Sequence, residues 1–512
     1  MCSTGSILVI KPMSVGKKRL PLFLILILAI ALRIFWISSR PIWYDEAFAI
    51  LFAEKGPSAM LIGTLTPAGG SASDVHPLAY YVLLWGWMRL FGDSLLVVRS
   101  LSVLFGIGLV VIVYLLGRDL FTPQIASWMA LFTAFSPFQI HYSQEIRMYA
   151  MLAFLSICAT WALWNAVKTS NKFWWGIYAL LVALALYTHN LAGFYLLPLS
   201  LTPILSKQWR ELRRLILALL VSLILYLPWM LQLPAQFSKV QSSYWTSRPG
   251  AGRLVTTLLS FTTNLPIAPT WLPVALFVTI LAFILAMWIG IKSVQSASIQ
   301  VRRGMALAYL AFTPPLFLFL VSQWQPIFIE RALLPSGATY LMFLAWSYQQ
   351  SVSPKLVRTG VIFFLLLGMG MGIYQHLTYQ GFPYAPYKEL AIALRKQAST
   401  EGVIIHSNKL SLLPLLYYDR GLPQVYVYDP PGSGVDTLAA PTRQMLGLVG
   451  ASSIEQAVGG ATHVWLVIFT RAISEYQQQG YDAHPHLQWL TDHFREVYFQ
   501  QWGDVRVYEF DR

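Results

Sequence analysis

Long hydrophobic runs alternate with short polar segments along most of the chain. A helix needs about 20 apolar residues to cross a bilayer, and about eleven runs approach this length. The pattern predicts a polytopic α-helical membrane protein whose transmembrane domain covers residues 1–378. The predicted spans lie at residues 20–39, 94–116, 124–140, 148–167, 173–189, 191–206, 213–233, 270–291, 305–323, 332–350 and 358–376.

The first run follows a basic cluster, Lys17, Lys18 and Arg19, as the hydrophobic part of a signal peptide does. Its apolar stretch is about 19 residues, longer than the roughly 7–15 of a signal peptide, and no small-x-small cleavage site is evident. We therefore expect an uncleaved first membrane helix.

The pattern changes after about residue 379, where charge rises and shorter apolar segments appear. Strand-like segments alternate here with segments of helical period, which favours a small α/β domain over residues 379–512. The expected strands lie at 403–406, 424–428, 463–468 and 505–508, and the expected helices at 387–396 and 486–494.

A long outer loop at about residues 40–92 separates the first two spans. Its second half, residues 77–91, has the pattern of an amphipathic helix too short to span, so we expect it in the membrane interface. A connection of this length usually has a function.

Composition supports the membrane class, since 56% of residues are hydrophobic and 11% are charged, against about 25% charged in a soluble chain. The net charge of +14 would suggest a nucleic-acid partner if the basic residues clustered in a soluble domain. They lie mainly in short loops between the apolar runs, as the positive-inside rule describes. We expect no nucleic-acid partner.

The same rule predicts the orientation, because one set of alternating loops holds about twice as many Lys and Arg as the other. With that set inside, the N-terminus is cytoplasmic. An odd number of spans then makes the C-terminal domain extracytoplasmic, and the setting is the cell's inner (cytoplasmic) membrane.

Polar residues that could carry chemistry concentrate at four places, all on the predicted outer side. Ionisable groups beside a membrane lose solvation free energy, so a chain that keeps them there has a use for at least some of them. These places are therefore functional candidates. They are Asp45-Glu46, Asp74 to Pro77 with His76, His141 to Tyr149 with Glu145 and Arg147, and Glu330-Arg331.

This combination suits transfer of a group from a lipid-linked phosphate. A carboxylate such as Asp45 can take the proton of an attacking hydroxyl. Arg147 and Arg331 can hold a phosphate leaving group through paired hydrogen bonds.

Four motifs resemble the bacterial branch of the protein O-mannosyltransferase superfamily, which with the lipid A aminoarabinose transferases forms part of the GT-C glycosyltransferases. They cover residues 20–200 well, the segment after Arg331 moderately, and the tail in general character only. The motifs are Trp43 to Glu46, His76 to Tyr81, Arg99 to Leu101 with Tyr114 to Arg118, and Gln144 to Tyr149.

The resemblance implies a GT-C fold and an inverting transfer of sugar from a polyprenyl-phosphate-linked donor to a protein, lipid or polysaccharide acceptor. It implies that Asp45 is the base, accompanied by Glu46. Arg147 and Tyr149 fall on the second-loop motif, with Glu145 as the acid before the arginine. His76 precedes Pro77 and Leu78, where the family commonly has a second proline.

Other interpretations stay open at the sequence level. The acids could mark a helix end, His76 could be a loop or cap residue, and the arginines could be anchors that reach for lipid headgroups. A transporter or flippase of lipid-linked sugars would instead place ionisable groups near the bilayer midplane and show paired halves. A membrane-anchored binding protein would depend on its outer domain and not on Asp45.

Cofactor expectations are limited. The sequence has no phosphate-binding glycine loop and no Cys/His metal motif. The carboxylates could hold a divalent cation beside the phosphate, but no ligand spacing selects one. We predict no tightly bound metal and no cofactor.

Overall fold

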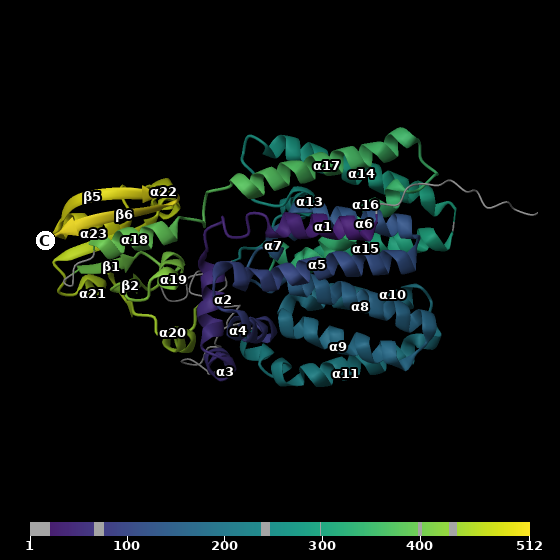
Figure 1. The fold of residues 1–512 in the computed structure, drawn as a ribbon, viewed down its shortest axis with the longest axis horizontal. Helices are drawn as coiled ribbons and strands as arrows, with labels where there is room; N and C mark the ends of the chain where they lie inside the picture. Colours follow the sequence, from purple (N-terminus) through teal and green to yellow (C-terminus); the bar gives the residue numbers. More distant parts are fainter. Residues whose placement is uncertain (1–20, 66–75, 237–245, 297, 398–401, 430–437) are drawn as a thin grey trace, which may run out of the picture.

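The computed structural model describes residues 21–65, 76–236, 246–296, 298–397, 402–429 and 438–512. Figure 1 shows a bundle of long helices, a domain built around a β-sheet at one end of it, and a group of shorter helices between the two. This is the predicted fold class, a helical membrane protein with a small C-terminal α/β domain.

Each predicted span coincides with a helix of the bundle. Within the described residues, six helices, or helices with their preceding turn, are long and apolar enough to cross a membrane: Leu95–Leu120, Tyr149–Thr169, Trp209–Met230, Leu272–Val294, Ile299–Val321 and Lys355–Thr378. The bundle helices are α1 (Leu22–Ile34), α5 (Leu95–Leu120), α6 (Pro123–Phe135), α8 (Tyr149–Thr169), α9 (Lys172–Thr188), α10 (Gly193–Leu205), α11 (Leu212–Met230), α14 (Leu272–Val294), α15 (Ile299–Val321), α16 (Leu334–Tyr348) and α17 (Lys355–Thr378).

Helix α16 lies at the centre of the bundle. Every residue from Leu334 to Ser347 is buried, and the helix packs on α15, α6 and α8. A helix that is apolar all round is one that is enclosed by other helices. By contrast, α11 and α14 expose rows of large hydrophobic side chains, as helices facing lipid do.

The shorter helices gather at the end of the bundle that faces the sheet domain (Figure 1). They connect the spans on this side, and three of them come from the long segment after α1. They are α2 (Tyr44–Glu54), α3 (Pro57–Leu65), α4 (Ala79–Phe91), α7 (Pro137–Ser143) and α13 (Gly252–Thr263), with the 3₁₀ turns η1 (Asn190–Ala192) and η3 (Glu330–Leu333); η2 (Trp209–Glu211) precedes α11.

The C-terminal domain contains a six-stranded sheet in the order β3-β2-β1-β4-β6-β5. The first four strands along this order pair in parallel, and β6 is antiparallel to both β4 and β5. The strands are β1 (Gly402–His406), β2 (Gln424–Val427), β3 (Gly450–Ala451), β4 (His463–Phe469), β5 (Arg495–Trp502) and β6 (Val505–Asp511).

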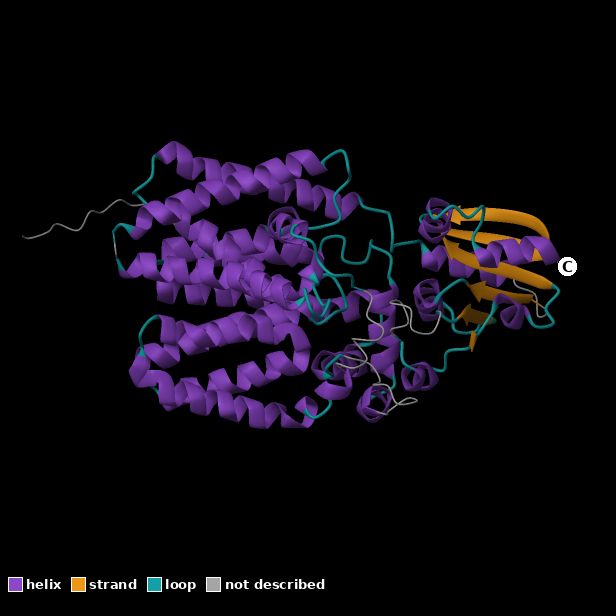
Figure 2. Cartoon of the chain, turned by 180° about the vertical axis from the view of Figure 1, so that it is seen from behind, coloured by secondary structure: helices purple, strands orange, loops and turns teal. Residues whose placement is uncertain are grey.

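Helices cover both faces of this sheet (Figure 2). One buried cluster contains Ile405, Val464 and Leu466, and another contains Ile404, Trp465 and Val467, because neighbouring residues of a strand point to opposite faces. The helices are α18 (Tyr387–Gln397), α19 (Lys409–Tyr418), α20 (Ala440–Leu446), α21 (Ile454–Val458), α22 (Thr470–Gln478) and α23 (Pro485–His493).

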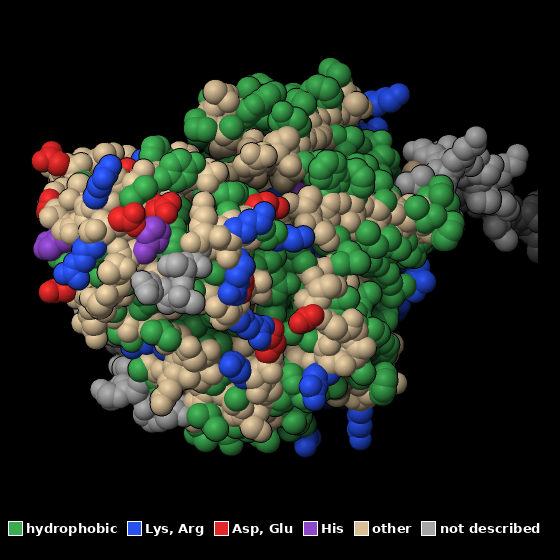
Figure 3. Space-filling model, turned by 60° about the vertical axis from the view of Figure 1, so that its left-hand side comes forward, with side chains coloured by type: hydrophobic (Ala, Val, Ile, Leu, Met, Phe, Trp, Pro, Cys, Tyr) green, Lys and Arg blue, Asp and Glu red, His purple; other side chains and the backbone are tan. Residues whose placement is uncertain are grey.

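The sheet domain is packed directly against α2 and α3. Leu413 of α19 is fully buried in the same hydrophobic core as α2. Arg420 forms an ion pair of 2.6 Å with Glu54 at the end of α2, and the Thr442 hydroxyl donates a 2.8 Å hydrogen bond to the carbonyl of Gly63 in α3. Figure 3 shows charged side chains on the domain and along its border with the helices, and a mostly hydrophobic flank beyond.

Candidate active site

Asp45 lies in the first turn of α2, the helix between the bundle and the sheet domain. A carboxylate is favoured at a helix N-terminus because the unpaired N–H groups there carry partial positive charge. About 15% of its side chain is exposed. The sequence motif therefore places its acid at the edge of the bundle and not within a span.

Two arginines from distant parts of the chain converge on this carboxylate. Arg331 of η3 donates a 3.0 Å hydrogen bond from Nη1 to Asp45 Oδ2. The Nε of Arg147, which lies between α7 and α8, is 3.8 Å from the same oxygen. Three of the residues predicted from sequence thus form one cluster.

The charge state of Asp45 follows from these neighbours. Burial by itself would raise the pKa of Asp45, but the guanidinium groups of Arg147 and Arg331, with a smaller contribution from His76, lower this pKa below its usual range. The carboxylate is therefore ionised at neutral pH.

Aromatic and imidazole rings surround the two arginines. The guanidinium of Arg331 lies 5.2 Å from the centre of the Tyr149 ring, and that of Arg147 lies 6.0 Å from it. Arg147 also donates hydrogen bonds to the Tyr81 hydroxyl at 3.1 Å and to His76 Nε2 at 3.4 Å. Tyr149 and His76 therefore lie in the same cluster as Asp45.

Glu46 faces away from this cluster. Its carboxylate accepts two hydrogen bonds from Arg99 of α5, at 2.9 Å from Nε and 2.7 Å from Nη2. It also accepts the backbone N–H of Ile146 at 3.1 Å. Arg99 in turn donates to the carbonyls of Ile37 and Arg40, so this fully buried pair joins α2, α5 and the segment that precedes Asp45.

Glu145 interacts electrostatically with Arg331 of the cluster, while its hydrogen bond is made with His141. His141 Nε2 is 3.1 Å from Glu145 Oε1, and Arg40 donates to His141 Nδ1 at 2.9 Å, so His141 must donate to Glu145. The other oxygen, Oε2, is buried with no hydrogen-bond partner among the described residues. Burial raises the pKa of Glu145 to about 7, although Arg331 and Arg40 oppose the increase.

Arg40 connects this group to the last span. Its Nη2 donates to both the ring and the carbonyl of His376 in α17, each at 2.7 Å, and its Nη1 is 3.4 Å from the Tyr384 hydroxyl. His376 Nε2 is 2.7 Å from Gln144 Oε1. The segment that leads to the sheet domain is thus anchored beside the candidate site.

Four further residues of this region were not among the predicted site residues, although three of them, Trp43, Tyr81 and Arg99, lie in the motifs that carry the resemblance. Arg99, Tyr81, Trp43 and His189 all contribute, the last through ring contacts of 5.7 Å with Tyr149 and 6.3 Å with His76. The position of Arg99 inside an apolar run was a usable signal, because an intramembrane arginine needs a partner. For the others, no spacing in the sequence indicates the contact.

The predicted group at Asp74 lies outside the described residues, apart from His76 and Pro77. Within the described ranges, no group of three or more His, Cys, Asp or Glu side chains is arranged to hold a metal ion. The expectations about metal and cofactor stay predictions.

Part of the chain matches a known protein family. Residues 75–231 match the model of the dolichyl-phosphate-mannose-protein mannosyltransferase family. Among curated proteins no sequence matches the chain.

Solved structures match over nearly the whole chain. ArnT from Cupriavidus metallidurans has a TM-score of 0.62 at 12% identity in its apo state, over 95% of this chain and 97% of that chain. The same protein bound to undecaprenyl phosphate has a TM-score of 0.61 at 12% identity, with the same coverage. The Archaeoglobus fulgidus oligosaccharyltransferase tethered with an acceptor peptide has a TM-score of 0.54 at 13% identity, over 94% of this chain and 73% of that chain.

These matches confirm the resemblance that the motifs predicted. The chain is a multi-pass helical membrane protein with the fold of ArnT and of the archaeal oligosaccharyltransferase. A fold hosts more than one activity, so the chemistry has to be argued from the site.

Proposed function

We propose that this protein is a membrane glycosyltransferase that moves a sugar from a polyprenyl-phosphate-linked donor to an acceptor, with inversion at the anomeric carbon. The observation that carries the proposal is one ionised carboxylate, Asp45, held between the guanidinium groups of Arg331 and Arg147. The acceptor is a protein, a lipid or a polysaccharide.

In the proposed reaction Asp45 accepts the proton of an acceptor hydroxyl. The hydroxyl oxygen forms a bond to the anomeric carbon while the bond from that carbon to the phosphate oxygen breaks. The electron pair leaves with the polyprenyl phosphate, whose added negative charge Arg331 and Arg147 stabilise. Proton, sugar and leaving group are all accounted for without a further reactant.

Donor binding also activates the base in this scheme. Without donor, the two arginines lower the pKa of Asp45, which makes it a weak proton acceptor. A phosphate that takes over hydrogen bonds from these arginines removes part of this stabilisation, so the pKa of Asp45 rises toward a value useful for a general base. Asp45 is therefore a weak base until the phosphate of the donor is bound.

The other predicted residues take supporting roles. Tyr149 and His76 hold the arginines through ring and hydrogen-bond contacts. Glu46 acts as a positioning residue through Arg99, and Glu145 adds an adjustable charge next to Arg331. No metal takes part in the proposed steps.

The location we propose is the outer face of the inner (cytoplasmic) membrane, with the N-terminus in the cytoplasm and the sheet domain outside. It is supported by the distribution of basic residues, which are richer in the loops at the ends of α8, α10, α14 and α16 away from the sheet domain. A lipid-linked donor is supported by the undecaprenyl phosphate bound to the ArnT of similar fold.

A transfer assay in lipid nanodiscs tests the proposal. Purified protein should convert an undecaprenyl-phosphate-linked sugar and a membrane-extract acceptor into undecaprenyl phosphate and a glycosylated product of inverted anomeric configuration. The Arg147→Gln/Arg331→Gln double variant should release no undecaprenyl phosphate. Movement of intact donor across a proteoliposome membrane without cleavage would instead favour the flippase.

A further inference from the structure

Glu145 is buried without the partners that a buried carboxylate normally has. Within the described residues three acidic side chains are buried, Glu46, Glu145 and Glu211. Glu46 and Glu211 accept hydrogen bonds on both carboxylate oxygens, and each has an arginine among its donors. Glu145 accepts one hydrogen bond, on Oε1 from His141, while Oε2 has no partner in the described ranges. An ionised carboxylate in this position is costly, because burial removes its water without full replacement.

A chain of hydrogen bonds fixes where a proton on Glu145 must lie. Arg40 has only N–H donors, and its Nη1 donates to His141 Nδ1 at 2.9 Å. The one N–H proton of the neutral imidazole is therefore on Nε2, which donates to Glu145 Oε1 at 3.1 Å. Burial, together with the charge of Arg40, lowers the pKa of His141 well below its usual range, so this imidazole stays neutral. A protonated Glu145 thus carries its hydrogen on Oε2.

Charged and titratable groups face Glu145 from each element that packs around it. Burial raises the pKa of Glu145 to about 7, and Asp45 adds to the increase, whereas three arginines oppose it, Arg331 most strongly. Glu145 is therefore partly protonated at neutral pH, and it takes up more proton when the effect of the arginines is reduced. The groups are Arg331 of η3, Arg40 before α2, Arg147 before α8, Asp45 and Glu46 of α2, His141 and Tyr142 of α7, and Tyr384 before α18.

The charge of the site also favours a neutral Glu145. Arg147, Arg331 and Asp45 meet with one net positive charge. The phosphodiester of a polyprenyl-linked sugar has one negative charge, so the two charges match. An ionised Glu145 would cancel the positive charge and repel the phosphate, since charges that lie close together in a partly buried site interact strongly.

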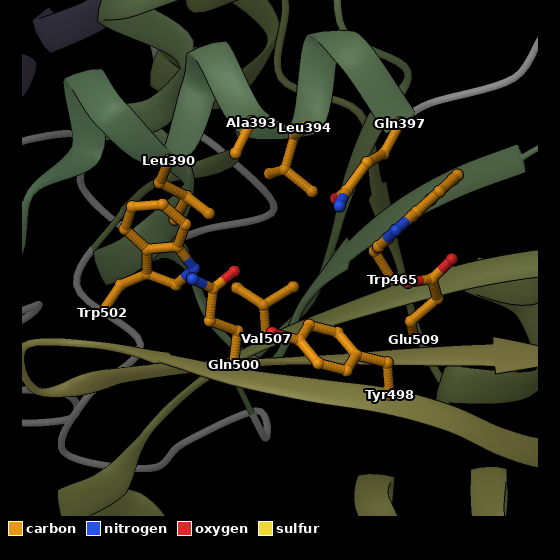
Figure 4. A pocket seen from close by; sticks show the side chains of 10 residues that line it. All are labelled: Leu390, Ala393, Leu394, Gln397, Trp465, Tyr498, Gln500, Trp502, Val507 and Glu509. Atoms are coloured by element: carbon orange, nitrogen blue, oxygen red, sulfur yellow. The ribbon is translucent and has the colours of Figure 1, made fainter.

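The recess in the sheet domain is unsuited to a charged ligand. Figure 4 shows this recess between α18 and the strands β4, β5 and β6, and it has room for about one water molecule. None of its lining residues is Lys or Arg. The phosphate is expected at the arginines beside the bundle instead.

We propose that the site binds the phosphodiester of the donor together with one proton, which Glu145 holds on Oε2. A phosphate that pairs with Arg331 and Arg147 offsets the two cations, which otherwise favour the ionised acid. The complex then has a protonated Glu145 at pH values where the free protein has largely lost this proton. Identifying the ligand as the sugar donor rests on the proposed function; the linkage between phosphate and proton does not.

Calorimetry with the full chain in phosphatidylcholine nanodiscs tests the proposal. The probe is methyl undecaprenyl phosphate, a phosphodiester that has no second ionisation near neutral pH and so takes up no proton itself. Titration at pH 7.5 in two buffers that differ in ionisation enthalpy measures the proton uptake. We expect about 0.8 proton per bound ligand, because about that fraction of an acid with a pKa of about 7 is ionised at this pH. The affinity should fall at least about tenfold between pH 7 and pH 9.

Glu145→Gln is the decisive variant, because an amide keeps the size of the side chain and can accept the hydrogen bond from His141 but cannot ionise. We expect no proton uptake and equal affinity at pH 7 and pH 9. Glu455→Gln is the control, since Glu455 is exposed on α21, and it should show the pH dependence of wild type. A role of Glu145 in folding alone would change the amount of folded protein and not the number of protons bound with each ligand.

Three results would overturn the proposal: phosphodiester binding without proton uptake, failure of the probe to bind, or an equal pH dependence in Glu145→Gln and wild type. Proton-linked binding in a protein that transfers no sugar would instead leave this inference standing and count against the proposed function.

Discussion

At the residue scale, the site depends on how one negative charge is kept at the border of a membrane. An ionised carboxylate with little water around it needs charged or hydrogen-bonding partners. Asp45 has both, in Arg331 and Arg147. The same two partners are what a phosphate would require, so the carboxylate and the donor compete for them.

This competition predicts that Arg331 binds the phosphate of the donor directly, which a substitution can test. Arg331→Gln removes a charge-assisted hydrogen bond, worth about 1.5–3 kcal/mol, so we expect undecaprenyl phosphate to bind about 10- to 100-fold more weakly. Binding in nanodiscs measures this. Arg253→Gln is the control, since Arg253 pairs with Glu330 next door, and an equal loss in both variants would refute a direct role of Arg331.

The raised pKa of Glu145 predicts that the stability of the protein depends on pH. Its pKa is raised from 4.5 in the unfolded chain to about 7 in the fold, so the folded protein keeps a proton that the unfolded chain has lost. The free energy of unfolding therefore falls as pH rises from about 4.5 to about 7, by about 3 kcal/mol for a shift of this size.

Glu145→Gln removes this dependence, and we expect a higher melting temperature than wild type at pH 8 but not at pH 4. Thermal unfolding in nanodiscs at both values provides the measurement. Glu455→Gln, at an exposed position of α21, should follow wild type at each pH. Equal melting temperatures of Glu145→Gln and wild type at pH 8 would contradict the raised pKa.

The sequence could predict the members of this cluster better than their contacts. Asp45, Arg147 and Arg331 are separated by 102 to 286 positions, yet the charge bias of the loops predicts that all three lie on one side of the membrane. Which way each acid faces depends on α5, and nothing in the pair Asp45-Glu46 distinguishes the one that meets Arg99.

At the element scale, α2 is the part that must be held. Glu46 and Arg99 form a buried pair that ties it to α5, and removing one partner leaves a buried charge uncompensated. We expect Arg99→Met to lower stability by about 3–5 kcal/mol, as breaking such pairs does. Chemical denaturation in detergent micelles measures the loss.

The double variant Glu46→Gln/Arg99→Met separates charge from shape. With both charges gone we expect it to be more stable than Arg99→Met alone, while transfer stays low because α2 is no longer fixed. If the double variant regained full transfer, the pair would have no positioning role.

Long apolar runs made the bundle helices predictable, because length and composition suffice for them. The apolar pattern does not predict helix α13, because this helix is short and amphipathic. Strand β5 was missed because it is exposed on both faces and lacks alternation of polar and apolar residues, and β3 has two residues only.

At the scale of the whole molecule, the sheet domain is part of the support of the site. α19 packs on α2, and α20 packs on α3, so the domain holds the segment that carries Asp45. The sequence predicted the domain from its strand and helix pattern. It could not predict this docking, because the contacts join residues more than 300 positions apart.

A substitution at Leu413 tests whether packing of the sheet domain on α2 supports the site. Its side chain is fully buried in the core shared with α2, and Leu→Ala in such a place costs about 2–5 kcal/mol. We expect Leu413→Ala to lower transfer severalfold although it touches no substrate. Val497→Ala, at an exposed position of β5, is the control, and unchanged transfer in a destabilised Leu413→Ala protein would argue against coupling.

The most direct measurement is a comparison of donor binding and sugar transfer in Asp45→Asn. We expect undecaprenyl phosphate to bind at least as tightly as to wild type, because a competing negative charge is removed, while transfer falls by about 10²- to 10⁴-fold with loss of the general base. Asp93→Asn should change neither. An Asp45→Asn protein that transfers sugar at the wild-type rate would contradict the account.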